Sequence, residues 1–356
     1  MALVHGDNFS IYGTNNNLLL DGVYAEYNGG MSVDPDGVSS GFVFNRGLPL
    51  VNGGFTNLRY VIPVGTPTTA GMALRLWISS LPSDGVATPR PIQFRDAGNG
   101  TVAELRVNTT GRIEVALAGG ATYTSANPAV TPNGWYHIEM KYTATTPGAT
   151  ASFEVRVEGL NVLSQTAVVS TGSAAVAQLA VGGSNNFGLT CPNFYIKDLV
   201  VWDSTGTYNN DFLGSVLVYN LVPTADVALN WTPVGAANGF SILDNIPPND
   251  AAYIDAPNPP PAAYKCDLSN LPINVTSVKG LISFIRASKT DGGDANIQTG
   301  IISDPAGTPT TVLGANRPIT IAKTYWRDVF ETDPDTAAPW LPSAVNLAQL
   351  QINRTT

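Results

Sequence analysis

Trp135-Tyr-His-Ile-Glu-Met-Lys-Tyr142 alternates between large apolar residues and polar ones, which is the period of a β-strand. The face that we expect to be buried carries Tyr136, Ile138, Met140 and Tyr142. His137 shares the opposite face with Glu139 and Lys141, and these two charged neighbours favour its exposure to solvent. The pattern therefore predicts a strand with one face on a hydrophobic core and the other in water.

Strands of the same kind are predicted along the whole chain. Residues 103–117 alternate on both sides of Asn108-Thr-Thr-Gly111, which predicts a hairpin whose turn uses the conformational freedom of Gly111. Further strands are predicted at 153–158, 195–202, 278–287, 297–302 and 319–330. No window has the 3.6-residue apolar repeat of a sustained helix. The sequence therefore predicts an all-β protein.

The length and the turn-rich stretches predict two β-sandwich domains. The chain has 356 residues, of which 44% are hydrophobic, enough for two separate cores. Residues 203–211 are rich in turn formers, so we place the first domain at 1–204 and the second at 205–356. The proline-rich stretch 255–263 then becomes a connection inside or beside the second domain. A boundary near 262 is the alternative.

Charge and hydropathy disfavour several classes of partner. The net charge is −9 and no basic run occurs, so neither nucleic acid nor an anionic membrane surface is an expected partner. No apolar stretch approaches the roughly 18 residues that would insert across a bilayer. Met1 to Asp7 lack the features of a signal peptide, which predicts synthesis in a cytoplasm. Cys191 and Cys266 have no zinc-site spacing and are expected to be buried free thiols.

The order of strands in the first two hundred residues resembles that of concanavalin A-like, laminin G-like jelly rolls. A hairpin like Leu105 to Val115 is followed by Asn133-Gly-Trp135-Tyr-His137-Ile-Glu. A strand like Phe153 to Val157 then precedes Phe194-Tyr-Ile-Lys-Asp-Leu-Val-Val-Trp202. The resemblance implies that residues 1–204 form a concanavalin A-like jelly roll.

A second resemblance, to structural proteins of tailed bacteriophages, runs over nearly the whole chain. The segments that carry it are Leu20-Asp-Gly-Val-Tyr-Ala-Glu26, Asn210-Asp-Phe-Leu-Gly214, Asn230-Trp-Thr-Pro233 and Val329-Phe-Glu-Thr-Asp-Pro-Asp335, with Trp340 and Val345-Asn346. This resemblance implies a virion component in a tail fibre, tail tip, baseplate or head decoration. The implied partners are other virion proteins and further copies of this chain in a homo-oligomer.

Groups for catalysis are scarce in the sequence. A glycosidase of the jelly-roll kind needs two carboxylates at a fixed separation, and here Arg156 lies between Glu154 and Glu158 on one predicted strand face. Hydrolysis by serine or cysteine needs a base, and the two histidines are predicted in a terminal arm (His5) and on an exposed strand face (His137). We therefore expect a protein that is not an enzyme, and a glycan hydrolase is the least favoured hypothesis.

Two kinds of binding site remain open. A carbohydrate site in a sandwich combines an aromatic platform with loop amides, and the residues that fit are Tyr123, Trp135, Asn185, Asn186 and Phe187. Calcium takes six to eight oxygen ligands. The loop residues that fit calcium are Asp203, Asn209, Asn210 and Asp211, with Asp34 and Asp36 in a second loop. The alternatives are that Trp135 packs under a loop and that the Asp and Asn residues only form turns, with no cofactor.

The sequence leaves two leading hypotheses for function. The first is a virion part that acts by protein–protein assembly and host-surface adhesion. The second is a carbohydrate-binding module for a host glycan. A low content of charged residues, 13%, suits extensive packing between β-domains, which the first hypothesis requires.

Overall fold

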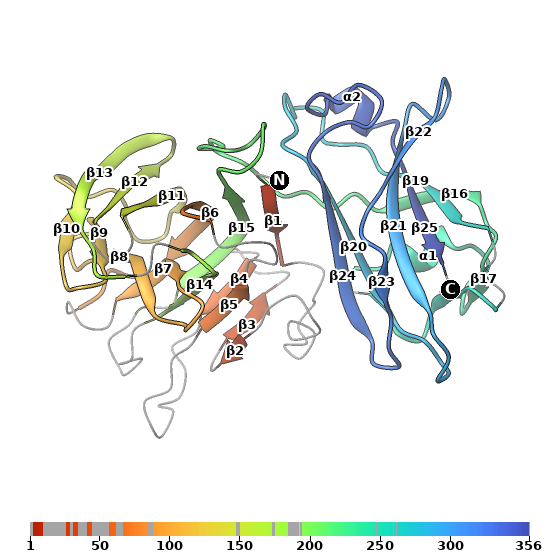
Figure 1. Ribbon diagram of the computed structural model, residues 1–356, viewed down its shortest axis with the longest axis horizontal. Helices are drawn as coiled ribbons and strands as arrows, with labels where there is room; N and C mark the ends of the chain where they lie inside the picture. The colour runs from red at the N-terminus through yellow and green to blue at the C-terminus, as the bar shows by residue number, and fades with distance from the viewer. Residues whose placement is uncertain are drawn as a thin grey trace. The chain divides into compact units, whose positions relative to one another are not determined.

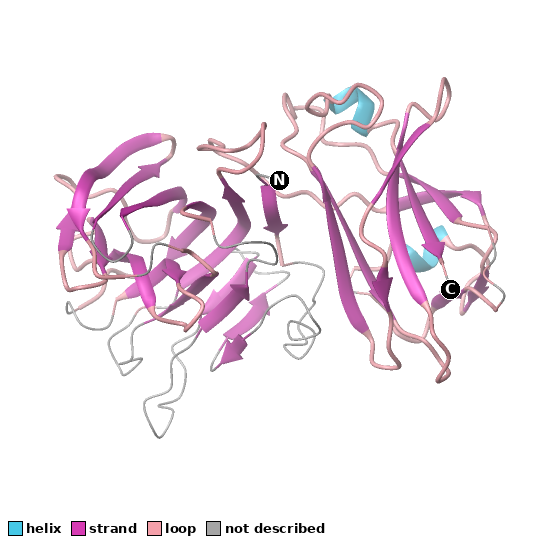
Figure 2. Ribbon diagram, in the orientation of Figure 1, coloured by secondary structure: helices cyan, strands magenta, loops and turns pink. Residues whose placement is uncertain are grey.

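The computed structural model describes residues 3–9, 26–28, 31–34, 41–44, 57–61, 67–83, 88–146, 150–172, 175–183, 192, 194–246, 248–258, 260 and 262–355. The chain divides into two compact units, Met1–Val218 and Tyr219–Thr356. Nearly all of the regular structure is antiparallel β-sheet, as Figure 2 shows, so the predicted all-β class is confirmed. In the described part of the chain no helix is long and apolar enough to cross a membrane.

The first unit contains a larger sheet with the strand order β13-β12-β11-β6-β15-β4-β3, to which β1 adds by pairing with β15 (Figure 1). Its strands are β1 (Leu3–Asp7), β3 (Met31–Asp34), β4 (Gly41–Phe44), β6 (Thr69–Ile78), β11 (Trp135–Thr146), β12 (Thr150–Val157), β13 (Leu160–Val169) and β15 (Phe194–Asp203).

A smaller sheet of the same unit has the strand order β10-β9-β8-β7-β14-β5-β2. Its strands are β2 (Glu26–Asn28), β5 (Asn57–Val61), β7 (Pro89–Arg95), β8 (Thr101–Val107), β9 (Ile113–Leu117), β10 (Thr122–Thr124) and β14 (Gln178–Gly183). The predicted hairpin of residues 103–117 is the β8–β9 pair.

Side chains from the two sheets meet in one core. Phe94 of β7 stacks on Tyr142 of β11 with ring centroids 5.9 Å apart. Ile138 and Met140 lie on the same face of β11 as Tyr142 and are fully buried. The period of two in this strand therefore identified its core face, and the two layers form the predicted sandwich.

The middle of the opposite face of β11 is buried, so the prediction that His137 is exposed there is wrong. His137 and Glu139 are both 0% exposed. Residues 211–218, here called the covering segment, run across this outer face of the larger sheet. The Glu139 carboxylate accepts hydrogen bonds from the backbone N–H groups of Leu213 and Gly214, at 2.8 and 3.2 Å. A buried carboxylate is tolerated here because backbone donors satisfy it.

His5 is also misplaced by the sequence argument. It lies in β1, which pairs with the end of β15, and it is fully buried instead of belonging to a terminal arm. Its Nε2 is 3.9 Å from a carboxylate oxygen of Asp7.

The second unit is built from a six-stranded sheet, two separate strand pairs and two single-turn helices (Figure 1). The six-stranded sheet contains β16 (Pro223–Ala228), β19 (Tyr264–Leu268), β25 (Gln349–Arg354), β21 (Asn296–Ser303), β22 (Thr310–Leu313) and β23 (Arg317–Pro318). The strand pairs are β17 (Thr232–Val234) with β18 (Tyr253–Asp255), and β20 (Leu281–Ala287) with β24 (Thr324–Phe330). The helices are α1 (Phe240–Leu243) and α2 (Pro342–Val345).

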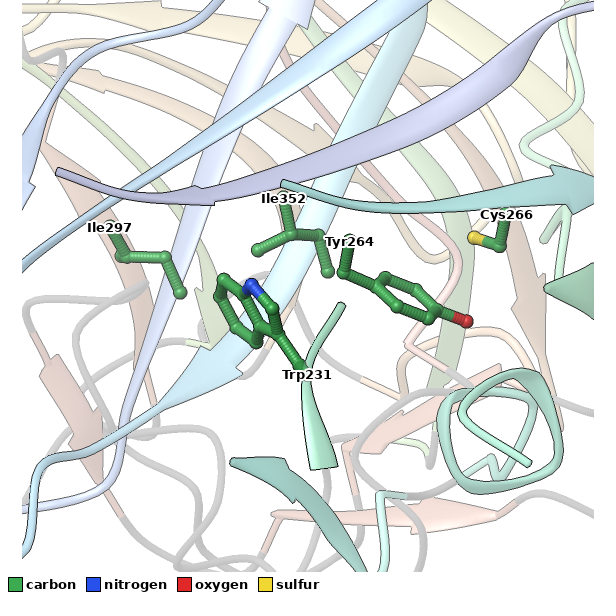
Figure 3. Close-up of a cluster of buried hydrophobic side chains, with 5 residues drawn as sticks. All are labelled: Trp231, Tyr264, Cys266, Ile297 and Ile352. Atoms are coloured by element: carbon green, nitrogen blue, oxygen red, sulfur yellow. The ribbon is translucent and has the colours of Figure 1, made fainter. Parts of the chain in front are cut away.

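One core cluster of the second unit forms around Trp231 (Figure 3). The buried side chains of this cluster are Trp231, Tyr264, Cys266, Ile297 and Ile352. The Trp231 indole donates a hydrogen bond to the carbonyl oxygen of Ala262 at 3.1 Å, so its polar atom is satisfied. Cys266 is a buried free thiol, as the sequence predicts, while Cys191 lies outside the described residues.

Candidate functional site

Three aromatic side chains form a row across the outer face of the larger sheet. Trp135 of β11 is the cross-strand partner of Trp77 of β6, and Trp77 is the partner of Tyr195 of β15. Directly opposed residues point to the same face of a sheet, so the three rings lie side by side. The Trp77 and Tyr195 rings meet edge to face with centroids 4.8 Å apart. All three side chains are partly exposed. We call them the aromatic row.

Basic residues occupy the next row of the same face. His137, Arg75 and Lys197 are cross-strand partners on β11, β6 and β15, one step inward from the aromatic row. The Lys197 ammonium nitrogen lies 4.2 Å from the centroid of the Trp135 ring, a cation–π distance. Arg75 is held differently, by Asp198 at 3.6 Å and by the Ser215 hydroxyl at 3.1 Å.

His137 is uncharged at neutral pH because of its surroundings. Burial lowers the pKa of its imidazole, and the positive charge of Arg75 lowers it further, to about 4 against an ordinary value of 6.5. The Glu158 carboxylate opposes this shift without cancelling it. Among the described residues, neither ring nitrogen of His137 has a hydrogen-bond partner. The imidazole therefore acts as a neutral packing group, and proton transfer near pH 7 does not suit it.

The covering segment occupies the part of the face next to these rows. Lys141 forms a 2.7 Å ion pair with Asp211. Phe212 packs edge to face on Trp202 with centroids 6.0 Å apart. The Asp198 carboxylate accepts a 3.0 Å hydrogen bond from the backbone N–H of Val218. The covering segment contacts this face as far along the strands as Arg75 and Asp198. The aromatic row lies one step further, at the ends of β6, β11 and β15.

The structure separates the residues predicted for a carbohydrate site. Trp135 belongs to the aromatic row. Tyr123 is on β10 of the other sheet, where its ring faces Phe153 with centroids 5.6 Å apart, so it fills the edge of the core instead of a loop platform. Asn185, Asn186 and Phe187 lie outside the described residues. Sequence reasoning missed Trp77 and Tyr195, because only the strand pairing brings them next to Trp135.

The residues predicted for calcium make turn and ion-pair contacts. Oδ1 of Asp203 accepts hydrogen bonds from the backbone N–H and the hydroxyl of Thr205, at 2.8 and 2.6 Å. Asn210 donates to the carbonyl oxygen of Gly206, and Asn209 has a left-handed backbone with φ +49°. Asp211 is the partner of Lys141, as described above. No group of three His, Cys, Asp or Glu side chains suited to a metal occurs among the described residues.

The second loop predicted for calcium contains Asp34 and Asp36. The side chain of Asp34 and all of Asp36 lie outside what the structure describes.

Comparison with known proteins returns solved structures only. No protein-family model and no curated protein sequence matches the chain. A sialidase matches with 14% identity and a TM-score of 0.40, covering 56% of this chain and 18% of its own. An endo-β-1,4-glucuronan lyase from the fungus Trichoderma reesei matches with 12% identity and a TM-score of 0.40, and the match covers 56% of this chain and 95% of the lyase. The alginate lyase Aly36B matches with 11% identity and a TM-score of 0.35, and the match covers 56% of this chain and 96% of the lyase.

The match therefore spans less than a fifth of the sialidase and nearly all of each lyase. At such identities these matches concern the fold alone, and they agree with a β-sandwich. The three matched proteins are enzymes, which contradicts the expectation that this chain is not one.

Proposed function

We propose that the first unit binds a polysaccharide along the aromatic row. The observation that carries this proposal is the alignment of Trp135, Trp77 and Tyr195 on three adjacent strands of one partly exposed sheet face. Neighbouring strands lie about 4.8 Å apart, so the row spans about 10 Å, comparable to a short stretch of sugar chain. Aromatic faces supply apolar contact area to the C–H faces of sugar rings at a small cost in side-chain entropy.

The position of the row on regular strands supports the same proposal. Side chains on paired strands are held more firmly than side chains on loops, so the platform is formed before the ligand arrives. Arg75 and Lys197 lie in the next row of the same face and supply polar groups that would orient a sugar.

Replacement of one ring tests the proposal. We expect Trp77→Ala to weaken binding to a responsive polysaccharide by roughly tenfold, because Trp77 is the central member of the row. Tyr253→Ala is the matched control, since Tyr253 is 48% exposed but lies in the second unit. Binding is measured on a polysaccharide array and then by calorimetry, and released reducing ends and unsaturated products are assayed in the same samples. Equal affinity of Trp77→Ala and the unaltered protein would contradict the proposal.

As its setting we propose the particle of a tailed bacteriophage, with other virion proteins and copies of this chain as partners and a host-surface glycan as ligand. Two of the residues that carry the resemblance to phage proteins, Trp231 and Trp340, are buried in separate core clusters of the second unit. The resemblance thus falls on residues that shape the fold. Mass spectrometry and density maps of purified particles test the proposal, and absence of the chain from them would overturn it.

A further inference from the structure

Lys197 is a basic group that contacts the aromatic row directly. Its ammonium nitrogen lies 4.2 Å from the Trp135 ring centroid, and β15 places it two residues after Tyr195 on the same face. The side chain is partly exposed. A cation at this distance from a ring has limited freedom, so a ligand that lies on the row meets a positive charge in a defined position.

Lys197 differs from its basic neighbours in having no salt bridge within the described part of the chain. On the outer face of the same sheet Arg75 is paired with Asp198, Lys141 with Asp211 and Arg156 with Glu154. Within the described part of the chain no carboxylate lies within salt-bridge distance of Lys197. Asp198, the next residue, forms its salt bridge with Arg75 and accepts a hydrogen bond from the backbone N–H of Val218. Burial raises the pKa of this carboxyl, and the charges of both Lys197 and Arg75 oppose the shift. Arg75 and Lys197 therefore share the carboxylate of Asp198, and these three groups leave one positive charge in excess beside the aromatic row.

We propose that the polysaccharide bound by the aromatic row is anionic, and that Lys197 binds its acidic group. This inference rests on the proposed function and adds a class of ligand to it. The rings contact the apolar faces of the sugars, and the ammonium group pairs with a carboxylate or a sulfate ester beside them. A neutral chain would leave Lys197 without a salt bridge and would gain only the stacking contacts.

Two matched pairs of polymers test whether the ligand is anionic and whether its acidic group is a carboxylate or a sulfate ester. Polygalacturonate is compared with its carboxyl-reduced form, and dextran sulfate is compared with dextran. Binding of the full chain is measured by calorimetry at low and at physiological salt. We expect the acidic member of at least one pair to bind roughly two- to fivefold more tightly, the range of an exposed ion pair, with a smaller difference at higher salt.

Variants of Lys197 separate charge from packing. Lys197→Met keeps an unbranched stem over Trp135 and should remove the preference for the acidic polymer, while Lys197→Arg should retain it. Lys289→Met is the control for loss of one positive charge in the second unit, and it should leave the preference unchanged.

The outcomes distinguish this inference from the proposed function. Equal binding of acidic and neutral polymers, with loss of both in Trp77→Ala, would support the aromatic row and overturn the anionic ligand. An acidic preference that survives in Lys197→Met would overturn the role of Lys197. Failure of every polymer to bind would overturn the proposed function and the inference together.

Discussion

Trp202 shows how one contact determines the identity of a residue on a neighbouring strand. The indole is fully buried, but it lies on the outer face of the larger sheet, above Gly71 and against Phe212. A Cβ atom built on Gly71 would lie 2.0 Å from the indole ring. Only glycine leaves room for this tryptophan, so the two residues specify each other.

A double-mutant cycle tests this relation. Trp202→Ala should lower the free energy of unfolding of the first unit by about 3–5 kcal/mol, the usual cost of removing a buried Trp. Gly71→Ala alone should be destabilising by about 1–3 kcal/mol or more because of overpacking. In the Trp202→Ala background the same glycine change should cost under about 1 kcal/mol. Additive effects in denaturant unfolding of the full chain would show that the two residues do not compete for space.

His137 makes the stability of the first unit depend on pH. Its folded pKa of about 4 lies below the ordinary value of 6.5, so between these two values the unfolded chain binds a proton that the folded chain does not. The contribution of His137 to the stability of the first unit is therefore complete above pH 6.5 and is lost as the pH falls towards 4. We expect a loss of roughly 1–2 kcal/mol between pH 7 and pH 5.

The variant His137→Leu should lose less stability over the same pH interval, because leucine does not titrate. The ring nitrogens also have no hydrogen bonds to replace within the described part of the chain. Denaturant unfolding of both proteins at pH 8, 7, 6 and 5 gives the difference, with pH 8 as the baseline. Parallel pH profiles for the two proteins would mean that His137 is not the titrating group.

At the scale of single elements, the covering segment explains why sequence reasoning succeeded on one face of β11 and failed on the other. Periodicity identifies which side chains share a face, and Ile138, Met140 and Tyr142 lie in the core as predicted. It does not show what covers the second face. Residues 211–218 are distant in sequence from β11, and no local pattern indicates that Leu213 and Gly214 donate to Glu139.

The aromatic row was hidden for a similar reason. Trp77, Trp135 and Tyr195 come from three separate parts of the sequence, and each is unremarkable in its own strand. Their alignment depends on the register of β11 with β6 and of β6 with β15. Register is set by long-range pairing, which one sequence without relatives does not reveal.

The contacts of the covering segment with the larger sheet suggest a later end for the first domain than residue 204. We propose that an independently stable first domain requires residues 1–218, and that a chain of residues 1–204 is less stable by about 3–6 kcal/mol. The shorter chain lacks the Phe212 ring that packs on Trp202 and the two backbone donors to the Glu139 carboxylate. Denaturant unfolding of both chains checks this, with Phe212→Ala in the longer chain as an intermediate case. Equal stability would show that the segment only lies on the sheet without stabilising it.

At the scale of the whole molecule, each of the two units has buried clusters of its own. The core of the second unit includes Cys266, which provides a chemical reporter for that unit alone. Burial raises the pKa of the Cys266 thiol to about 12, although the neighbouring Tyr264 opposes the shift. A thiol with this pKa holds almost no thiolate at neutral pH, and the thiolate is the reactive form. Cys266 should therefore react only after its core has opened.

We expect the two units to unfold as separate transitions, and Cys266 to follow the second unit only. In a Cys191→Ser background, a disulfide reagent at pH 8 should modify the chain along the denaturation curve of the second unit. Trp231→Ala removes a large side chain of the Cys266 cluster and should lower the free energy of unfolding of the second unit by about 3–5 kcal/mol. Cys266 should then be modified at a lower denaturant concentration. Trp202→Ala should shift the transition of the first unit and leave Cys266 protected. If either variant moved both transitions together, the two units would fold as one cooperative body.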